Sequence, residues 1–149
     1  MTQLHESDIE QMLIDQLKGK GYDYLYGPDI APDSETPMRA SFEEVVLRDK
    51  LENAVKRLNP SLPYSVLDEA VKTVLRISSP DILANNEEFH RLLTEGIPVS
   101  VHKDGAERGE RIWLIDFNDP HNNEFTVVNQ FTIIENGHNR RPDVLLFVN

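Results

Sequence analysis

The sequence predicts an α+β fold, in which a mixed β-sheet is flanked by helices. Two observations lead to this prediction. Apolar residues recur at helical spacing in four stretches between positions 7 and 94. From position 97 onward they alternate or form short runs separated by turn residues, which is typical of strands. We therefore expect a single domain over 1–149, with a helical part at about 41–95 and a sheet part at about 97–149.

The first helix is expected at 7–18, where Ser7 and Glu10 have the spacing of a capping box and Gly19 ends the pattern. Its apolar residues share one face: Ile9, Met12, Leu13 and Leu17. A short strand at 22–26 follows. The segment 27–37 contains three prolines and no periodicity, so we expect an exposed and mobile loop.

Three more helices are expected. The second begins at another apparent capping box, Ser41 and Glu44, and ends at Asn59-Pro60. The third begins near Ser65 and ends before Ser78-Ser79-Pro80. The fourth covers about 86–94 and is closed by Gly96.

The remaining residues predict strands. The runs 97–101 and 112–117 flank an Asp104-Gly105 turn and form a hairpin. A longer strand at 125–134 leads to an Asn136-Gly137 turn, a basic linker at 138–141, and a last strand that Pro142-Asp143 opens.

Composition restricts the chemistry. The 149 residues are 39% hydrophobic and contain no cysteine, which indicates a globular chain without disulfides or thiolate metal sites. The five histidines lack zinc spacing, so a bound metal is expected to have oxygen ligands. No apolar run approaches the roughly 20 residues of a membrane span, and the N-terminus lacks the pattern of a signal peptide. We expect a soluble, cytoplasmic protein.

The net charge of −11 argues against a simple nucleic-acid binder, because phosphate contacts come from Lys and Arg. An acidic chain can still belong to a metal-dependent nuclease if its carboxylates bind divalent ions and its basic residues cluster. The charge lowers the expectation of DNA binding without removing it.

Asp143 is the first candidate site residue. It precedes five apolar residues and is therefore expected to be held rigidly at the edge of a core, as a metal ligand requires. By pattern alone, an aspartate at a strand start is more often solvated or paired, here with Arg140 or Arg141.

Three blocks of sequence carry a resemblance to a known family: GYDYLYGPDIAP, FHRLLTEGIPV and VNQFTIIENGHNRRPDVLLFVN. In this order they closely resemble the N-terminal nuclease domain of the R subunit (HsdR) of type I restriction-modification enzymes, from about Glu6 to the last residue. The resemblance implies a PD-(D/E)xK nuclease fold, Asp143 as its first metal-binding acid, and Mg²⁺ as cofactor. It also implies that a Glu-x-Lys strand follows in the family, so we expect this chain to stop short of it and to be inactive alone.

The resemblance further implies what the whole protein does. The family cleaves double-stranded DNA in a reaction coupled to ATP-driven translocation, within a complex that includes methyltransferase and specificity subunits. No Gly-x-x-x-x-Gly-Lys loop is present, so the ATP-driven motor is expected outside these residues. Without the next strand, 144–148 is expected to expose an edge, and we expect dimers of the chain or a non-native edge contact through it.

Other candidates keep two interpretations each. Glu10 fits an additional catalytic acid on the first helix or a helix cap, with Glu6 as a weaker alternative. The basic run His138, Arg140 and Arg141 fits DNA phosphate contact, which we favour, or solvated surface.

Polar and aromatic residues have two interpretations as well. Asn129 and Gln130 match the family's Asn-Gln-Phe block, and we expect them to form cross-strand hydrogen bonds. Trp113 and the tyrosines of 22–26 fit stacking on bases, but packing in the core or at its rim is favoured.

A second hypothesis is a docking module that has no chemistry of its own. Its acidic helices would then bind a partner subunit, as the net charge and the helical part at about 41–95 suggest. Docking requires neither Asp143 nor metal, and this distinguishes the two hypotheses.

Overall fold

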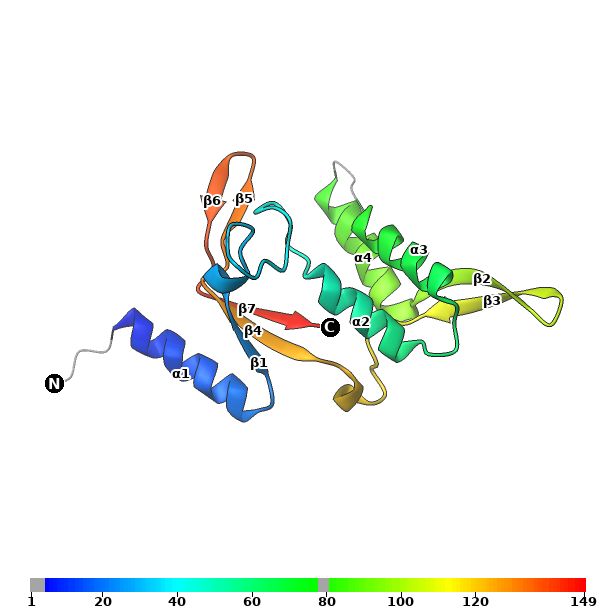
Figure 1. Cartoon of the computed structure of the whole chain (residues 1–149), viewed down its shortest axis with the longest axis horizontal. Helices are drawn as coiled ribbons and strands as arrows, with labels where there is room; N and C mark the ends of the chain where they lie inside the picture. The colour runs from blue at the N-terminus through cyan, green and yellow to red at the C-terminus, as the bar shows by residue number, and fades with distance from the viewer. Residues whose placement is uncertain (1–4, 78–80) are drawn as a thin grey trace. The chain divides into compact units, whose positions relative to one another are not determined.

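The computed structural model describes residues 5–77 and 81–149 (Figure 1). Its elements are α1 (Glu6–Gly19), β1 (Asp23–Tyr26), a 3-10 turn (Gly27–Ile30), α2 (Arg48–Leu58), α3 (Tyr64–Leu75), α4 (Ile82–Glu95), β2 (Ile97–Lys103), β3 (Ala106–Ile112), a second 3-10 turn (Pro120–Asn122), β4 (Phe125–Asn129), β5 (Ile133–Glu135), β6 (His138–Arg140) and β7 (Val144–Val148). The predicted α+β class is confirmed. The expected helix stop at Ser78-Ser79-Pro80 lies outside the described residues.

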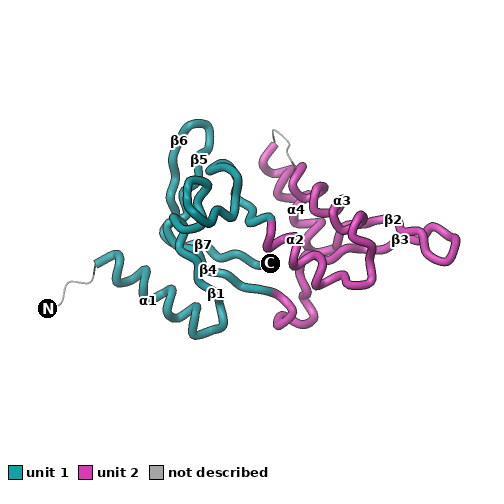
Figure 2. The backbone as a smooth tube through the Cα atoms, viewed as in Figure 1, with its two compact units in different colours: residues 1–48, 124–149 teal, residues 49–123 magenta. Residues whose placement is uncertain are grey.

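The chain forms two compact units (Figure 2). Unit 1 consists of 1–48 and 124–149, and unit 2 consists of 49–123. Unit 2 therefore lies in the sequence between the two halves of unit 1. The expectation of a single domain stays a prediction, because compact units are defined by their contacts and not by whether they fold alone.

Unit 1 contains a three-stranded mixed sheet in the order β1-β4-β7. The central strand, β4, pairs in parallel with β1 and antiparallel with β7 (Figure 1). The last pairs at one end are Tyr26 with Asn129 and Asn129 with Val144. The carboxyl ends of β1 and β4 and the amino end of β7 therefore lie together, and Asp143 is at this end of the sheet.

The core of unit 1 forms around Ile30, Leu47, Val128 and Phe131. The segment 27–37 contributes to it, since Ile30 and Ala31 are 4% and 6% exposed. The prediction of an exposed loop was wrong for this part. The apolar face of β4 requires a cover, and the 3-10 turn at Gly27–Ile30 provides one.

The start of α1 differs from the prediction. The N-cap residue is His5, and its backbone N–H donates to the carboxylate of Asp8 over 2.9 Å. The predicted capping box of Ser7 and Glu10 is therefore wrong, because Asp8 already caps the helix. Glu10 lies in the second turn and is available for other contacts.

The second helix begins at Arg48 and not at Ser41. The carboxylate of Glu44 accepts from the backbone N–H of Ala40 over 2.7 Å, while the guanidinium of buried Arg39 donates to the Glu44 carbonyl over 2.9 Å. The same guanidinium lies 3.7 Å from the ring centroid of Phe131. These contacts stabilise a turn where the sequence pattern indicated a helix start.

The predicted strand at 125–134 is interrupted. β4 ends at Asn129 because Gln130 has a left-handed backbone, with φ of +54°. The Asn136-Gly137 turn is confirmed, with φ of +50° and +76°. The residues expected as a basic linker instead form β6, which pairs with β5.

Unit 2 contains α2, α3, α4 and the hairpin β2-β3, whose Asp104-Gly105 turn is confirmed. Its second strand ends at Ile112, so the predicted strand at 112–117 was wrong. The backbone N–H and C=O of Trp113 bond to the side chain of buried Asn59, at 2.8 and 2.9 Å, and not to another strand. In the described residues, no helix has the length and apolar character needed to cross a membrane.

Candidate active site

Asp143 stands immediately before β7, with its side chain exposed. Its backbone C=O accepts a hydrogen bond from the backbone N–H of Gln130 over 3.1 Å. Within the described residues, Asp143 forms no ion pair with Arg140 or Arg141, the pairing that its strand-start position also suggested. The backbone of Asp143 is thus fixed to the sheet, whereas its carboxylate is accessible.

Glu10 reaches the same end of the sheet from α1. Its Oε1 accepts from Nδ2 of Asn129 over 2.7 Å, and its Oε2 accepts from Nε2 of Gln130 over 3.0 Å. Both oxygens of the half-buried carboxylate are therefore oriented by amide donors. The cap interpretation of Glu10 is excluded by this geometry, because a capping carboxylate points back to the start of its own helix.

Tyr24 completes this group from β1. Its hydroxyl donates to Oδ1 of Asn129 over 2.9 Å, and Nζ of Lys18 lies 5.7 Å from the centroid of its ring. Burial raises the pKa of the Tyr24 phenol above its usual 10.0, and neighbouring Tyr26 and Glu10 raise this pKa further. Tyr24 therefore keeps its proton at neutral pH and remains a donor to Asn129.

Gln130 is hydrogen-bonded to both candidate acids, to the backbone of one and to the side chain of the other. The backbone N–H of Gln130 donates to the backbone C=O of Asp143, and its side-chain Nε2 donates to the carboxylate of Glu10. The acids that the sequence placed on a helix and at a strand start are thus brought to a common end of the sheet. Glu6, the weaker alternative, is exposed in the first turn of α1.

The donor chemistry of this pair suits magnesium. Mg²⁺ prefers oxygen ligands and is commonly held by one or two carboxylates, with the remaining positions filled by water and substrate phosphate. In the part of the chain that the structure describes, no group of three or more His, Cys, Asp or Glu side chains could hold a metal. Asp143 and Glu10 each offer carboxylate oxygens of the kind that Mg²⁺ prefers, and a magnesium site at these residues stays a prediction.

The basic run lies just before Asp143 in the sequence. His138 and Arg140 belong to β6, where Arg140 pairs with Ile133, and Arg141 follows this strand. All three side chains are exposed. They can be reached by a polyanion, and the strand pairing fixes the backbone from which two of them project.

Sequence reasoning missed the partners of Glu10. Asn129 and Gln130 were expected to form cross-strand hydrogen bonds. Asn129 does so, because its Oδ1 accepts from the Tyr24 hydroxyl on β1. The amide nitrogens of both residues donate to Glu10 on α1, which was not expected. Tyr24 was expected to pack or to stack on bases, with packing favoured, and its hydrogen bond to Asn129 was not expected. The available signal was a pair of adjacent amides in an otherwise apolar strand, since buried amides need partners.

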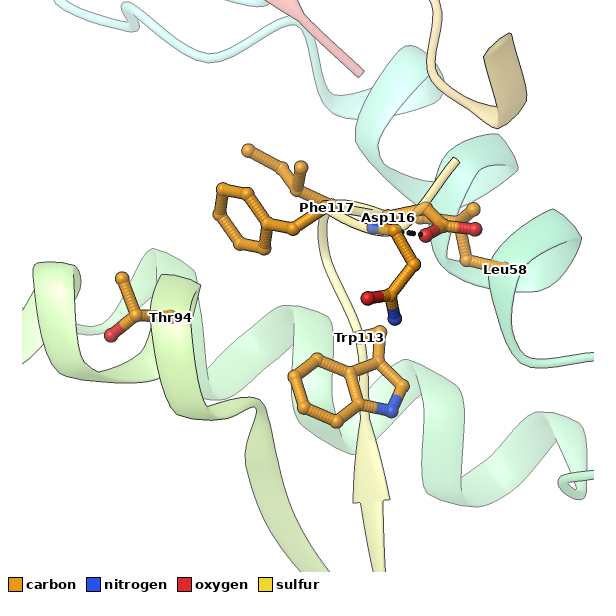
Figure 3. A pocket seen from close by; sticks show the side chains of 7 residues that line it. Leu58, Thr94, Trp113, Asp116 and Phe117 are labelled. Carbon is orange, nitrogen blue, oxygen red and sulfur yellow. Dashed lines mark hydrogen bonds between the residues drawn. The ribbon is translucent and has the colours of Figure 1, made fainter. Parts of the chain in front are cut away.

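A pocket of about 360 Å³ lies in unit 2 (Figure 3). Its lining residues are Leu58, Thr94, Trp113, Ile115, Asp116, Phe117 and Asn118. Trp113 is 41% exposed, which agrees with packing at a rim. The side-chain amide of Asn122 and the backbone N–H groups of Asp119 and Asn118 donate to the Asp116 carboxylate and lower its pKa. Because the carboxylate already accepts these hydrogen bonds, the role of Asp116 is to stabilise the loop that contains it.

Comparison with known proteins identifies the family. Residues 3–149 match the family described as type I restriction enzyme R protein N terminus. The chain is 36% identical over 147 residues to the type I restriction enzyme HindI endonuclease subunit of Haemophilus influenzae, covering 98% of this chain and 14% of that protein. It is 33% identical over 144 residues to the "Putative type I restriction enzyme MjaIXP endonuclease subunit" of Methanocaldococcus jannaschii, covering 95% of this chain and 14% of that protein. This chain belongs to the family of type I restriction enzyme R protein N-terminal regions.

Proposed function

We propose that these residues form part of the nuclease site of a type I restriction R subunit, a Mg²⁺-dependent and ATP-dependent endonuclease that cleaves double-stranded DNA. The observation that carries the proposal is the bonding of Gln130 to both Asp143 and Glu10, in a chain whose family is named for R proteins. The chain spans 14% of the length of its relatives, so the activity belongs to the longer protein.

Asp143 and Glu10 are proposed to hold the magnesium ion. When bound, the ion polarises the scissile phosphate and lowers the pKa of the attacking water. The chain's own contribution is position: two amides orient the Glu10 carboxylate, and strand pairing fixes the backbone of Asp143. A site built in this way requires little rearrangement when metal and substrate bind.

His138, Arg140 and Arg141 are proposed to contact DNA phosphates. A guanidinium offers paired donors that match phosphate oxygens, and the exposed run is next in sequence to Asp143. Because the net charge is −11, this local cluster must work against the overall charge. We therefore assign most of the DNA-binding affinity to other parts of the complex, which includes methyltransferase and specificity subunits.

The 149-residue chain alone is proposed not to cleave DNA. It supplies two candidate acids, but its sequence contains no Glu-x-Lys, the half of the family motif that carries another acid and the lysine. ATP is likewise used by motor domains outside these residues. Plasmid nicking by the purified 149-residue chain in Mg²⁺ would contradict this part of the proposal.

The test of the function uses the intact protein, reconstituted with its partner subunits. Asp143→Ala and Glu10→Gln are each expected to reduce Mg²⁺-dependent cleavage of plasmid by on the order of 100-fold or more, because each removes a carboxylate from the ion. DNA-stimulated ATP hydrolysis is the control and is expected to be unchanged. If both variants cleave at the normal rate, the proposed site is wrong and the docking hypothesis is favoured. Assembly with the partner subunits is then the property to measure.

A further inference from the structure

Gln130 contacts both candidate acids through two different groups. Its backbone N–H donates to the carbonyl of Asp143 over 3.1 Å, and its side-chain Nε2 donates to Oε2 of Glu10 over 3.0 Å. The first bond belongs to the backbone of the sheet, whereas the second reaches α1. A single residue therefore lies between the two acids and is bonded to each.

The backbone of Gln130 is held in an unfavourable conformation. A φ of +54° is left-handed, which residues with a Cβ adopt rarely. This conformation ends β4 immediately after Asn129. Such conformations persist where the surrounding structure enforces them, and they are common at functional sites.

The surrounding structure at this point is tightly packed. A Cβ placed on Gly27 would lie 2.5 Å from the backbone oxygens of both Asn129 and Gln130, so the glycine backbone lies directly against this peptide. The next residue in the sequence, Phe131, is fully buried, with 0% exposure. Gln130 is thus fixed between two packed neighbours and has little freedom to change its φ.

Asn129 supports the same arrangement. It is 8% exposed, its Oδ1 accepts from the Tyr24 hydroxyl, and its Nδ2 donates to Glu10. An ionised carboxylate accepts hydrogen bonds and cannot donate them, so the amide must turn its nitrogen toward Glu10. The Tyr24 hydroxyl satisfies the oxygen that faces away.

From these contacts we infer that Gln130, assisted by Asn129 and Tyr24, is a positioning residue that sets the place of the Glu10 carboxylate relative to Asp143 for a divalent cation. This inference rests on the proposed function, since it presumes that the two acids act together. Gln130 itself is not assigned a contact with metal or DNA. Its left-handed backbone and its amide are both used to place Glu10.

The test is Gln130→Gly in the intact protein. Glycine accepts φ of +54° without strain and keeps the backbone bond to Asp143, so only the bond to Glu10 is removed. Mn²⁺ binding is measured in the absence of ATP. The binding site that is followed is the one that is lost in the Asp143→Ala variant. The affinity of that site is expected to fall about 10–100-fold, as for other residues that orient metal ligands. Cleavage is expected to fall with it.

Asn136→Gly is the matched control, because Asn136 is also left-handed, with φ of +50°, and lies in the β5-β6 turn. It is expected to leave Mn²⁺ affinity and cleavage unchanged. Equal losses in both variants, or unchanged Mn²⁺ affinity in Gln130→Gly, would overturn the inference. If Asp143→Ala removes no Mn²⁺ site and leaves cleavage intact, the proposed function fails and this inference fails with it.

A milder variant covers the case in which Gln130→Gly does not fold. Tyr24→Phe removes only the hydroxyl that orients Asn129 and keeps the ring beside Lys18. Mn²⁺ affinity is expected to weaken severalfold, whereas Tyr64→Phe, at an exposed residue that begins α3, is expected to leave it unchanged. Unchanged affinity in a folded Tyr24→Phe protein would then decide against the inference.

Discussion

Asn129 and Glu10 are 119 residues apart in sequence, yet the amide of the first donates to the carboxylate of the second over 2.7 Å. This bond attaches α1 to the end of the central strand. Asn129 is buried and Glu10 is half-buried, so the bond is partly shielded from water, which strengthens the electrostatic attraction between donor and acceptor.

The first prediction concerns the charge at this bond. Asn129→Asp is expected to lower the free energy of unfolding by about 1–3 kcal/mol, because it replaces a buried donor with an acceptor that faces the Glu10 carboxylate. Adding Glu10→Gln is expected to restore part of the loss, since glutamine supplies a donor. Urea unfolding of the two single variants and the double variant measures this coupling. Asn139→Asp, exposed on β6, serves as the control and is expected to change stability by less than about 0.5 kcal/mol.

The second prediction concerns Gly27. Gly27→Ala is expected to destabilise unit 1 by about 1–3 kcal/mol, because the new Cβ would meet backbone oxygens at 2.5 Å that cannot move aside. Thermal unfolding is the measurement. Gly19→Ala, where nothing lies within 4 Å of the added carbon, is the control and is expected to be neutral or slightly stabilising. Equal melting temperatures for the two variants would contradict the close packing at Gly27.

The third prediction concerns pH. The folded-state pKa of Asp116 lies below its usual 3.8, because Asn122 and then the backbone of Asp119 donate to its carboxylate. A lowered pKa contributes stability that is present above the unfolded pKa and is lost as the pH falls through the folded value. Asp116→Asn is therefore expected to be less stable than the parent chain at neutral pH, with a difference that shrinks below pH 3.8.

Urea unfolding across this pH range measures the difference. Asp104→Asn is the control: its carboxylate is 75% exposed and lies 3.8 Å from Arg108, and exposed ion pairs of this kind contribute little. A stability difference for Asp116→Asn that stayed constant down to acidic pH would show that the carboxylate's charge has no role in the loop.

The fourth prediction concerns β7. Among the described strands it pairs only with β4, and its outer residues Leu146 and Val148 are 54% and 42% exposed. An apolar edge of this kind tends to pair with another chain. The 149-residue chain is expected to associate with rising concentration in light scattering, and Leu146→Lys is expected to reduce the association. A monomer at all concentrations, with the β7 amides protected from exchange, would count against it.

The elements found from sequence were those fixed by local chemistry. The Asp104-Gly105 and Asn136-Gly137 turns need left-handed backbones, which these residue types tolerate. The positions of the turns can therefore be predicted from two residues each. The apolar spacing of α1 also predicted its extent to within one residue at each end. Asp143 was found at the opening of a strand, as the Pro-Asp pair indicated.

The errors came from contacts between distant residues. Ser41 and Glu44 have the residue types and spacing of a capping box. In the structure, however, Arg39 and Ala40 donate hydrogen bonds to Glu44, and these residues form a turn. The peptide of Gln130, where β4 ends, lies directly against Gly27, about a hundred positions earlier, and no local pattern indicates this contact. The partners of Glu10 were missed for the same reason, since no local pattern tells which helix a strand-end amide will meet.

Residues 49–123 separate β1 from β4 in the sequence, and this separation affects folding during synthesis. The parallel pairing of β1 with β4 requires the chain to close a long loop, although each doubling of loop length adds only about 0.6 kcal/mol to the cost of closure. Pairing over such a distance slows folding far more than it weakens the folded state. A growing chain on the ribosome presents Glu10 early but gives it no partner until Asn129 has been synthesised, so the two acids assemble only near the end of this region's synthesis.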